Sequence, residues 1–273
     1  MATMTGLALT QRGEEDGGLV FASSPPPAVA AGEDALTGAG AERFAKAMSS
    51  EGAKIYERRI ADQKRELFTA LDDSCANVLE LGIGSGPNLG YYGSSVKKLT
   101  GVDPNPFMLD KVAAAQTGEG EDASAPQQQL RRKKTAGGVE PTLVRGFGEK
   151  LPFADGSFDA VVSTLVLCSV EDPEQVVREI ARVLKPGGRY LFMEHVRGSG
   201  SLALAQDAAD PMQVRMAAGC HLNRRTGEII LGAPAFASVA PVQEFSAMGD
   251  RGEQFLISPH VMGVAWKAAA VAA

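Results

Sequence analysis

Apolar positions along the chain follow two spacings, which together predict strands that alternate with helices. Short apolar runs bounded by turn residues predict strands over 77–81, 96–102, 142–145, 158–164 and 189–194. Apolar residues at helical spacing predict helices over 53–71, 107–115 and 173–184, the first of them amphipathic. Because such units form right-handed crossovers, the pattern predicts an α/β fold with a mostly parallel sheet and helices on both faces.

The pattern is weaker in three other parts of the chain. Residues 1–40 are rich in Gly, Ala, Ser and Pro, and they predict a disordered leader before a single domain over 41–273. Residues 117–139 are polar and predict a flexible insertion between a helix and the next strand. Near the end, the sequence predicts a helix over 202–217 and an antiparallel pair of strands over 239–245 and 260–267.

Composition narrows the class of ligand. The formal net charge of -6 opposes binding to nucleic acid or to an anionic membrane, because both need a basic field, and it favours a small-molecule ligand. The longest charge-free stretch near the C-terminus, 229–243, contains Pro234 and Pro241 and is shorter than the ~20 apolar residues that span a bilayer. No transmembrane segment is therefore expected, while peripheral membrane association and the oligomeric state stay open.

Cysteine and histidine spacing predicts neither a disulfide framework nor a metal site. The cysteines are scattered and form no CxxC pair, and the histidines form no HExxH pattern; they are Cys75, Cys168, Cys220, His195, His221 and His260. Scattered thiols indicate a reducing compartment, and the cytoplasm is the simplest expectation. Glu14-Glu15-Asp16 are unusual in a transit peptide, but a plastid, a mitochondrion or the surface of an internal membrane stays an alternative.

A glycine-rich turn follows the first predicted strand. Gly82, Gly84 and Gly86 let the backbone approach a ligand closely, and Pro87 can occupy the first turn of a following helix. A dinucleotide fingerprint would have its third glycine where this chain has Pro87. Glu80, just before the turn, would repel a pyrophosphate but suits a cationic amino-acid group. The turn therefore favours S-adenosylmethionine over NAD.

Two later segments complete the predicted nucleotide site. Asp103 ends the second predicted strand about 20 residues after the turn, where a carboxylate can accept both ribose hydroxyls. Residues 146–153 follow the third strand, where a loop backbone could read the adenine edge between Leu151 and Phe153.

Residues 56–188 resemble the type-11 group of class I S-adenosylmethionine-dependent methyltransferases. The resemblance rests on the glycine turn, Asp103, Glu149-Lys150-Leu151-Pro152-Phe153, Asp155-Gly156-Ser157-Phe158-Asp159 and Arg182-Val183-Leu184-Lys185-Pro186-Gly187-Gly188. The chain is more closely similar to the methyltransferase-like thiol S-methyltransferases, through Lys64-Arg65-Glu66-Leu67-Phe68, Asp103-Pro104-Asn105-Pro106, residues 163–170, Phe192-Met193-Glu194-His195-Val196, Gly219-Cys220 with Leu222 and Arg224, and Pro259-His260. Animal members carry an N-terminal hydrophobic anchor that has no counterpart in these residues.

The resemblance implies a fold, a cofactor and a set of site residues. The fold is a Rossmann-like methyltransferase sheet of seven strands, mostly parallel, with an antiparallel C-terminal strand. The cofactor is S-adenosyl-L-methionine. The implied donor contacts are Tyr56, in a helix that covers the site, together with Glu80, Gly82, Gly84, Gly86, Asp103, Pro104, Asn105, Gly148, Glu149, Thr164 and Leu165.

Methyl transfer from a sulfonium is an in-line displacement, in which the protein aligns the reactants and excludes water. His195 at the end of a strand is the candidate base or acceptor-orienting group, with a histidine bonded to the backbone as the alternative. Cys168 is expected to pack in the core, and a direct displacement needs no thiolate from Cys220. His221 and Arg224 either line the acceptor pocket or lie in a surface loop.

Three functions compete. The resemblance favours methylation of a small lipophilic thiol, which with a reference pKa near ~8.5 is partly ionised at neutral pH. The second is C- or O-methylation of a quinol or another isoprenoid-like acceptor. The third is a donor-binding regulatory or scaffold subunit.

Overall fold

The computed structural model describes residues 20–21, 38–117, 135–247 and 256–269. Their centre is a sheet in the order β1-β4-β3-β2-β5-β6-β8-β7. The strands are β1 (Val20–Phe21), β2 (Asn77–Leu81), β3 (Lys98–Asp103), β4 (Thr142–Arg145), β5 (Phe158–Thr164), β6 (Leu184–His195), β7 (Phe236–Ser246) and β8 (Pro259–Lys267). Strands β1 to β6 pair in parallel, whereas β8 is antiparallel to both β6 and β7. The predicted fold class is confirmed, and β1 adds two residues at one edge.

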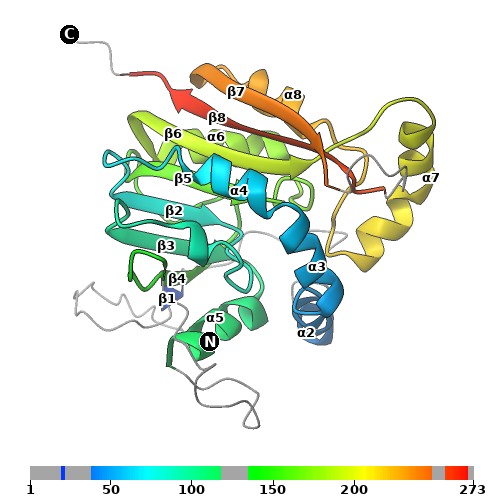
Figure 1. The fold of residues 1–273 in the computed structure, drawn as a ribbon, viewed down its shortest axis with the longest axis horizontal. Coiled ribbons are helices and arrows are strands. Elements are labelled where there is room, and N and C mark those ends of the chain that lie inside the picture. Colours follow the sequence, from blue (N-terminus) through cyan, green and yellow to red (C-terminus); the bar gives the residue numbers. More distant parts are fainter. Residues whose placement is uncertain (1–19, 22–37, 118–134, 248–255, 270–273) are drawn as a thin grey trace, which may run out of the picture.

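Helices cover both faces of the sheet (Figure 1). The described helices are α2 (Gly38–Ala47), α3 (Glu51–Arg59), α4 (Ala61–Phe68), α5 (Pro106–Thr117), α6 (Pro173–Val183), α7 (Gly200–Met216) and α8 (Thr226–Leu231), with a 3-10 turn η1 (Leu89–Tyr91). Phe68 of α4 and Leu109 of α5 pack with Val78 on one face, while Val176 of α6 and Ile230 of α8 pack with strand residues on the other. Successive strand residues point to opposite faces, so each strand feeds both layers.

Two predicted helices differ from the structure. The helix expected over 53–71 is divided at Ile60, whose φ of -99° and ψ of 7° end α3 and begin α4. Ile60 is fully buried, so the chain turns there: α4 lies along the sheet and α3 runs beyond its edge (Figure 1). After the glycine turn only η1 forms, because Gly90 and Gly93 flank Tyr91 and Tyr92 and glycine disfavours helix.

The C-terminal predictions and the strand boundaries agree well with the structure. Strands β7 and β8 form the expected antiparallel pair, and α7 covers the expected helix. Most of the predicted leader and residues 118–134 of the predicted insertion lie outside the described residues. None of the described helices is long and apolar enough to cross a membrane.

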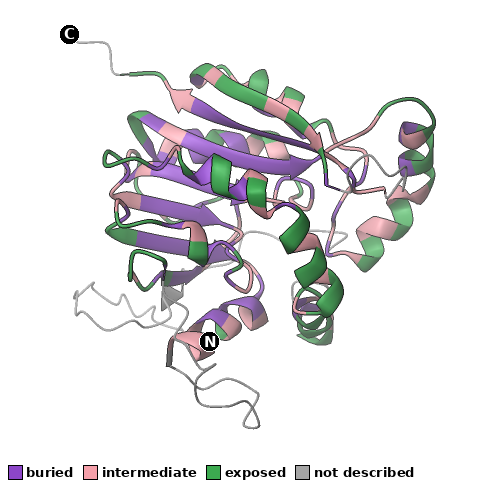
Figure 2. Cartoon of the chain, viewed as in Figure 1, coloured by how far each residue is buried: buried purple, intermediate pink, exposed green. Residues whose placement is uncertain are grey.

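The parallel strands end at one edge of the sheet, at the right of Figure 1, and helices α2, α3 and α7 lie beyond that edge. Figure 2 shows a buried sheet interior next to largely exposed α3 and α7. In parallel α/β sheets, ligands bind outside the carboxyl ends of the strands. The predicted site residues of β2, β3, β5 and β6 all belong to this carboxyl edge.

Candidate active site

The glycine turn begins where β2 ends. Gly82, Gly84 and Gly86 have φ of 67°, 54° and 77°, a left-handed conformation that side chains disfavour. The N–H groups of Gly82 and Ile83 both donate to the carbonyl of Val102, at 2.7 and 3.1 Å, which ties the turn to β3. A Cβ on Gly84 would meet no atom closer than 4.0 Å, so Gly84 is where the turn leaves space for a ligand.

Asp103 lies at the end of β3, directly beside the turn. Its carboxylate accepts hydrogen bonds from the N–H of Gly84 at 3.0 Å and of Asn105 at 2.9 Å. Burial raises the pKa of Asp103 to about 6, against the lowering effect of these two hydrogen bonds. The structure therefore joins the predicted ribose carboxylate and the predicted glycine turn in one place.

Glu80 lies beneath the turn and is fully buried. Its two oxygens accept hydrogen bonds from Asn88 Nδ2 at 2.8 Å and from the Tyr92 hydroxyl at 2.9 Å. Burial raises the pKa of Glu80 to about 7, although both hydrogen bonds lower it. Asn88 Nδ2 also donates to Thr164 Oγ1 at 2.9 Å, so Glu80 braces the turn against the end of β5. No sequence pattern points to Asn88 or Tyr92, because a lone amide and a lone phenol have no distinctive spacing.

The other predicted donor residues lie around Asp103 and make structural contacts of their own. Asn105 Nδ2 donates to the Ala41 carbonyl at 3.0 Å, and the Pro104 carbonyl accepts from Arg145 Nε at 3.2 Å. Gly148 is buried, and a Cβ there would lie 3.1 Å from Val176. Glu149 Oε1 accepts from the N–H of Glu171 at 2.9 Å. Their direct contact with the donor stays a prediction.

The loop after β5 carries the residues on the other side of the site. Leu165 has a φ of 61°, which is strained for a residue with a side chain. Glu194, buried on β6, accepts from the N–H groups of Val166 and Leu167 through Oε1, at 3.1 Å each. The carboxylate thereby holds the loop in a conformation that the backbone would not adopt alone.

Tyr56 connects α3 to the carboxyl edge. Its hydroxyl lies 2.5 Å from His260 Nε2, and His260 Nδ1 is hydrogen-bonded to the Ser258 carbonyl at 2.8 Å. The His260 ring also stacks on Phe245, with 5.0 Å between ring centroids. Since α3 contributes no fully buried side chain, this contact fixes the predicted covering helix over the site.

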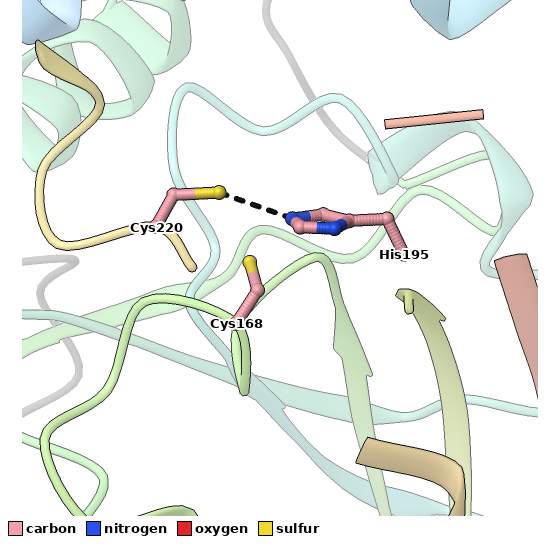
Figure 3. Close-up of side chains that lie close together, drawn as sticks. All are labelled: Cys168, His195 and Cys220. Carbon is pink, nitrogen blue, oxygen red and sulfur yellow. Dashed lines mark hydrogen bonds between the residues drawn. The ribbon is translucent and has the colours of Figure 1, made fainter. Parts of the chain in front are cut away.

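His195 ends β6 and points at two thiols (Figure 3). Its Nε2 lies 3.0 Å from Cys220 Sγ, and the three ligand atoms of Cys168, His195 and Cys220 lie within 4.8 Å of one another. The sequence does not predict that these residues lie together, because 25 or more positions separate His195 from either cysteine. Cys168 follows β5 and His195 ends the neighbouring strand β6, which is a signal that could have joined these two, whereas Cys220 follows α7 and has no such signal.

Hydrogen bonding and burial decide the state of the thiol. The interaction with Cys168 and burial raise the pKa of Cys220 well above its ordinary range, so the thiol stays protonated at neutral pH. Cys220 is therefore no nucleophile by itself. His221 Nδ1 pairs with Asp210 at 2.9 Å, and Arg224 Nη1 donates to the Leu167 carbonyl at 2.6 Å. Both side chains thus support the loops that carry the thiols.

Two hollows in the surface lie away from the carboxyl edge. One is lined by Leu67, Gln243 and Met262, and the other by Phe68 and Tyr91. Neither touches the glycine turn or His195, so the grouping of polar residues, rather than surface shape, locates the candidate site.

Comparison with known proteins agrees with this geometry. Residues 79–192 match the family model of the methyltransferase domain. The chain is 34% identical over 232 residues to thiol S-methyltransferase TMT1B of Rattus norvegicus, covering 82% of this chain and 86% of that protein. It is 33% identical over 224 residues to thiol S-methyltransferase TMT1A of Homo sapiens, covering 78% and 82%.

Solved structures share the fold. A SAM-dependent methyltransferase from Thermotoga maritima superimposes with a TM-score of 0.55 at 20% identity, covering 83% of this chain and 97% of that one. The YcgJ protein of Bacillus subtilis gives a TM-score of 0.56 at 16% identity, covering 77% and 100%. The sheet order, the donor edge and the relatives agree: the chain belongs to the class I S-adenosylmethionine-dependent methyltransferases, in the family that includes the thiol S-methyltransferases.

Proposed function

We propose that this methyltransferase transfers the methyl group of S-adenosylmethionine to the sulfur of a small, lipophilic thiol. The observation that carries the proposal is the extent of the likeness to proteins named thiol S-methyltransferase, at 33% to 34% identity over 78% to 82% of the chain. A likeness over 78% to 82% of the chain is too long to be confined to the segments that are predicted to hold the donor.

The chemistry of the carboxyl edge supports a thiol acceptor. Hydroxyl and carbon acceptors need a strong base, whereas a thiol with a pKa near ~8.5 supplies its own anion close to neutral pH. Glu80, Asp103 and Glu194 each accept hydrogen bonds from protein donors through at least one oxygen. Asp103 and Glu194 hold backbone N–H groups and Glu80 holds two side chains, so we assign all three to the structure of the site rather than to proton transfer.

The proposed reaction is a direct displacement. Asp103 binds the ribose of the donor, the glycine turn holds its amino-acid part, and Tyr56 covers the bound donor. The acceptor sulfur attacks the methyl carbon, the bond from that carbon to the sulfonium breaks, and the thiol proton leaves to solvent. The products are a methyl thioether and S-adenosylhomocysteine. His195 lies beside the acceptor position and orients the incoming sulfur.

The test is transfer of labelled methyl from S-adenosylmethionine to parallel panels of alkyl thiols and quinols by the purified chain. Methyl thioethers, identified by mass spectrometry, are the expected products. Transfer to quinols alone would replace the thiol proposal with C- or O-methylation. Donor binding without transfer to any acceptor would instead identify a regulatory or scaffold subunit.

A further inference from the structure

Cys168, His195 and Cys220 form a compact group of soft ligands at the acceptor end of the site (Figure 3). Cys168 lies after β5, His195 ends β6, and Cys220 follows α7. Their exposed fractions are 2%, 4% and 8%, and their ligand atoms all lie within 4.8 Å of one another. One imidazole and two thiols from three separate segments of the chain thus lie close together in a buried position.

The backbone holds this arrangement at some cost. The N–H of His221 donates to the Cys168 carbonyl at 2.8 Å, which joins the two cysteine loops directly. Before Cys220, Ala218 and Gly219 have φ of 52° and 85°. A Cβ on Gly219 would lie 3.0 Å from the Ser169 carbonyl oxygen, so only glycine fits. Strained backbone of this kind is common at functional sites and persists where the surroundings fix it.

His195 is not satisfied by its protein neighbours. Its Nδ1 is buried and has no hydrogen-bond partner among the described residues, and its Nε2 faces only a thiol. In the neutral ring with its proton on Nδ1, Nε2 keeps a lone pair that faces the thiols, and a ligand would use this lone pair. The geometry is better explained if the Nε2 lone pair and the two sulfurs share a ligand.

We propose that Cys168, His195 and Cys220 bind one Zn²⁺ and leave its fourth position open for the acceptor thiol. Two Cys and one His, with an open fourth position, are a known ligand set of catalytic zinc. Two thiolates and a neutral imidazole cancel the charge of the metal, which suits a buried site. This differs from the absence of a metal site that the sequence spacing predicts, because the fold, not the spacing, brings the ligands together.

The metal would activate the acceptor. Zn²⁺ deprotonates a thiol that coordinates it, and the released proton goes to solvent. The coordinated sulfur attacks the methyl carbon as the sulfonium bond breaks, which yields a neutral thioether that coordinates Zn²⁺ weakly and leaves. His195, the metal ligand on β6, is three strands away from Asp103 on β3, which corresponds to about 14 Å at ~4.8 Å per strand. The activation step rests on the proposed thiol function, whereas metal binding does not.

Metal content tests the site without an assay of activity. The reduced, purified chain is incubated with Zn²⁺ alone, passed through a desalting column and analysed by mass spectrometry for metal. The expected result is about one Zn²⁺ per chain, and Co²⁺ in its place should give the thiolate-to-metal absorption of a tetrahedral site. The double variant Cys168→Ser, Cys220→Ser should lose both signals.

Cys75→Ser is the matched control, because Cys75 is equally buried but lies outside the cluster, beside Asp72. It should bind as much metal as the unaltered chain. Calorimetric binding of S-adenosylmethionine reports whether each variant is folded. If the folded double variant retains Zn²⁺, or if the unaltered chain binds none, the zinc inference is wrong.

Metal removal separates this inference from the proposed function. We expect a chelator to slow thiol methylation at least ~10-fold without changing donor affinity, and added Zn²⁺ to restore it. Stoichiometric zinc together with quinol methylation alone would preserve the site and overturn the thiol function. Full thiol methylation by a chain that binds no zinc would preserve the function and overturn the site.

Discussion

At the scale of single residues, three buried carboxylates organise the carboxyl edge of the sheet. Glu80 braces the glycine turn, Asp103 fixes its middle, and Glu194 holds the loop after β5. Burial raises the pKa of each, so the fold keeps these groups at some cost near neutral pH. A buried carboxylate that lowers stability indicates that its charge or its hydrogen bonds serve the site. Substitutions of Asp103 and Glu80 test this directly.

Replacing Asp103 tests the donor site. An amide presents an N–H₂ where the carboxylate now accepts from either Gly84 or Asn105, and it loses the charge that strengthens bonds to the ribose hydroxyls. We expect Asp103→Asn to weaken S-adenosylmethionine binding about 100-fold by calorimetry, as for the loss of one or two charge-assisted hydrogen bonds. Asp110→Asn, on the exposed side of α5, is the control and should bind normally. Unchanged affinity of the Asp103 variant would contradict the assignment.

Replacing Glu80 tests its raised pKa through stability. A carboxyl whose pKa rises on folding, here from 4.5 to about 7, gives stability that is present at low pH and is lost as the pH rises through that range. Glu80→Gln has no such titration, and its amide can donate to Asn88 Oδ1, which has no hydrogen-bond partner among the residues that the structure describes. Without donor, the unaltered chain should lose about 1 kcal/mol per pH unit relative to the variant between pH 5 and 7. Urea unfolding at several pH values measures this, and parallel curves would show that Glu80 titrates normally.

At the scale of elements, the glycine turn and the loop after β5 are in contact. Gly82 faces Val166, and a Cβ on Gly82 would lie 2.4 Å from the Val166 Cγ2 atom. Val166 belongs to the loop that Glu194 holds and that leads to Cys168. The turn therefore packs directly against the loop that leads to Cys168.

Two alanine variants distinguish packing from ligand space within the turn. Gly82→Ala combines a left-handed backbone with overlap on Val166, and we expect it to lower the free energy of unfolding by about 3 kcal/mol. Gly84→Ala has room for the methyl group and should cost only about 1 kcal/mol, while its Cβ enters the space predicted for the donor. Thermal unfolding should therefore show the larger loss of stability for Gly82→Ala, and calorimetry should show the larger loss of donor affinity for Gly84→Ala. Equal stability losses would contradict the contact.

At the scale of the whole molecule, the layered fold was predictable and the acceptor side was not. Apolar runs such as 158–164 predict central strands, because a parallel strand that is buried on both faces carries apolar side chains along most of its length. The apolar spacing does not predict the break at Ile60, because a buried isoleucine fits one long helix equally well. The sequence also predicts a helix after Pro87 where only η1 forms, because a glycine turn after a strand is usually followed by a helix. The cluster of Cys168, His195 and Cys220 depends on long-range loop positions, which no local pattern encodes.

The segment of α2 and α3 has a consequence for the order of events in a reaction cycle. Two hydrogen bonds hold it: the Ala41 carbonyl accepts from Asn105 beside the predicted donor site, and the Tyr56 hydroxyl is hydrogen-bonded to His260 beside the predicted acceptor site. The segment therefore contacts both predicted halves of the site, and we expect spent donor and methylated product to leave only when it moves. We expect a rapid burst of product in the first turnover, followed by a slower steady rate set by release. Tyr56→Phe, which loosens one fastening, should shrink the difference between burst and steady rates in rapid-quench measurements, whereas Tyr91→Phe, packed against Phe68, should not. A burst of this kind would mean that release of product, and not methyl transfer, sets the rate of turnover.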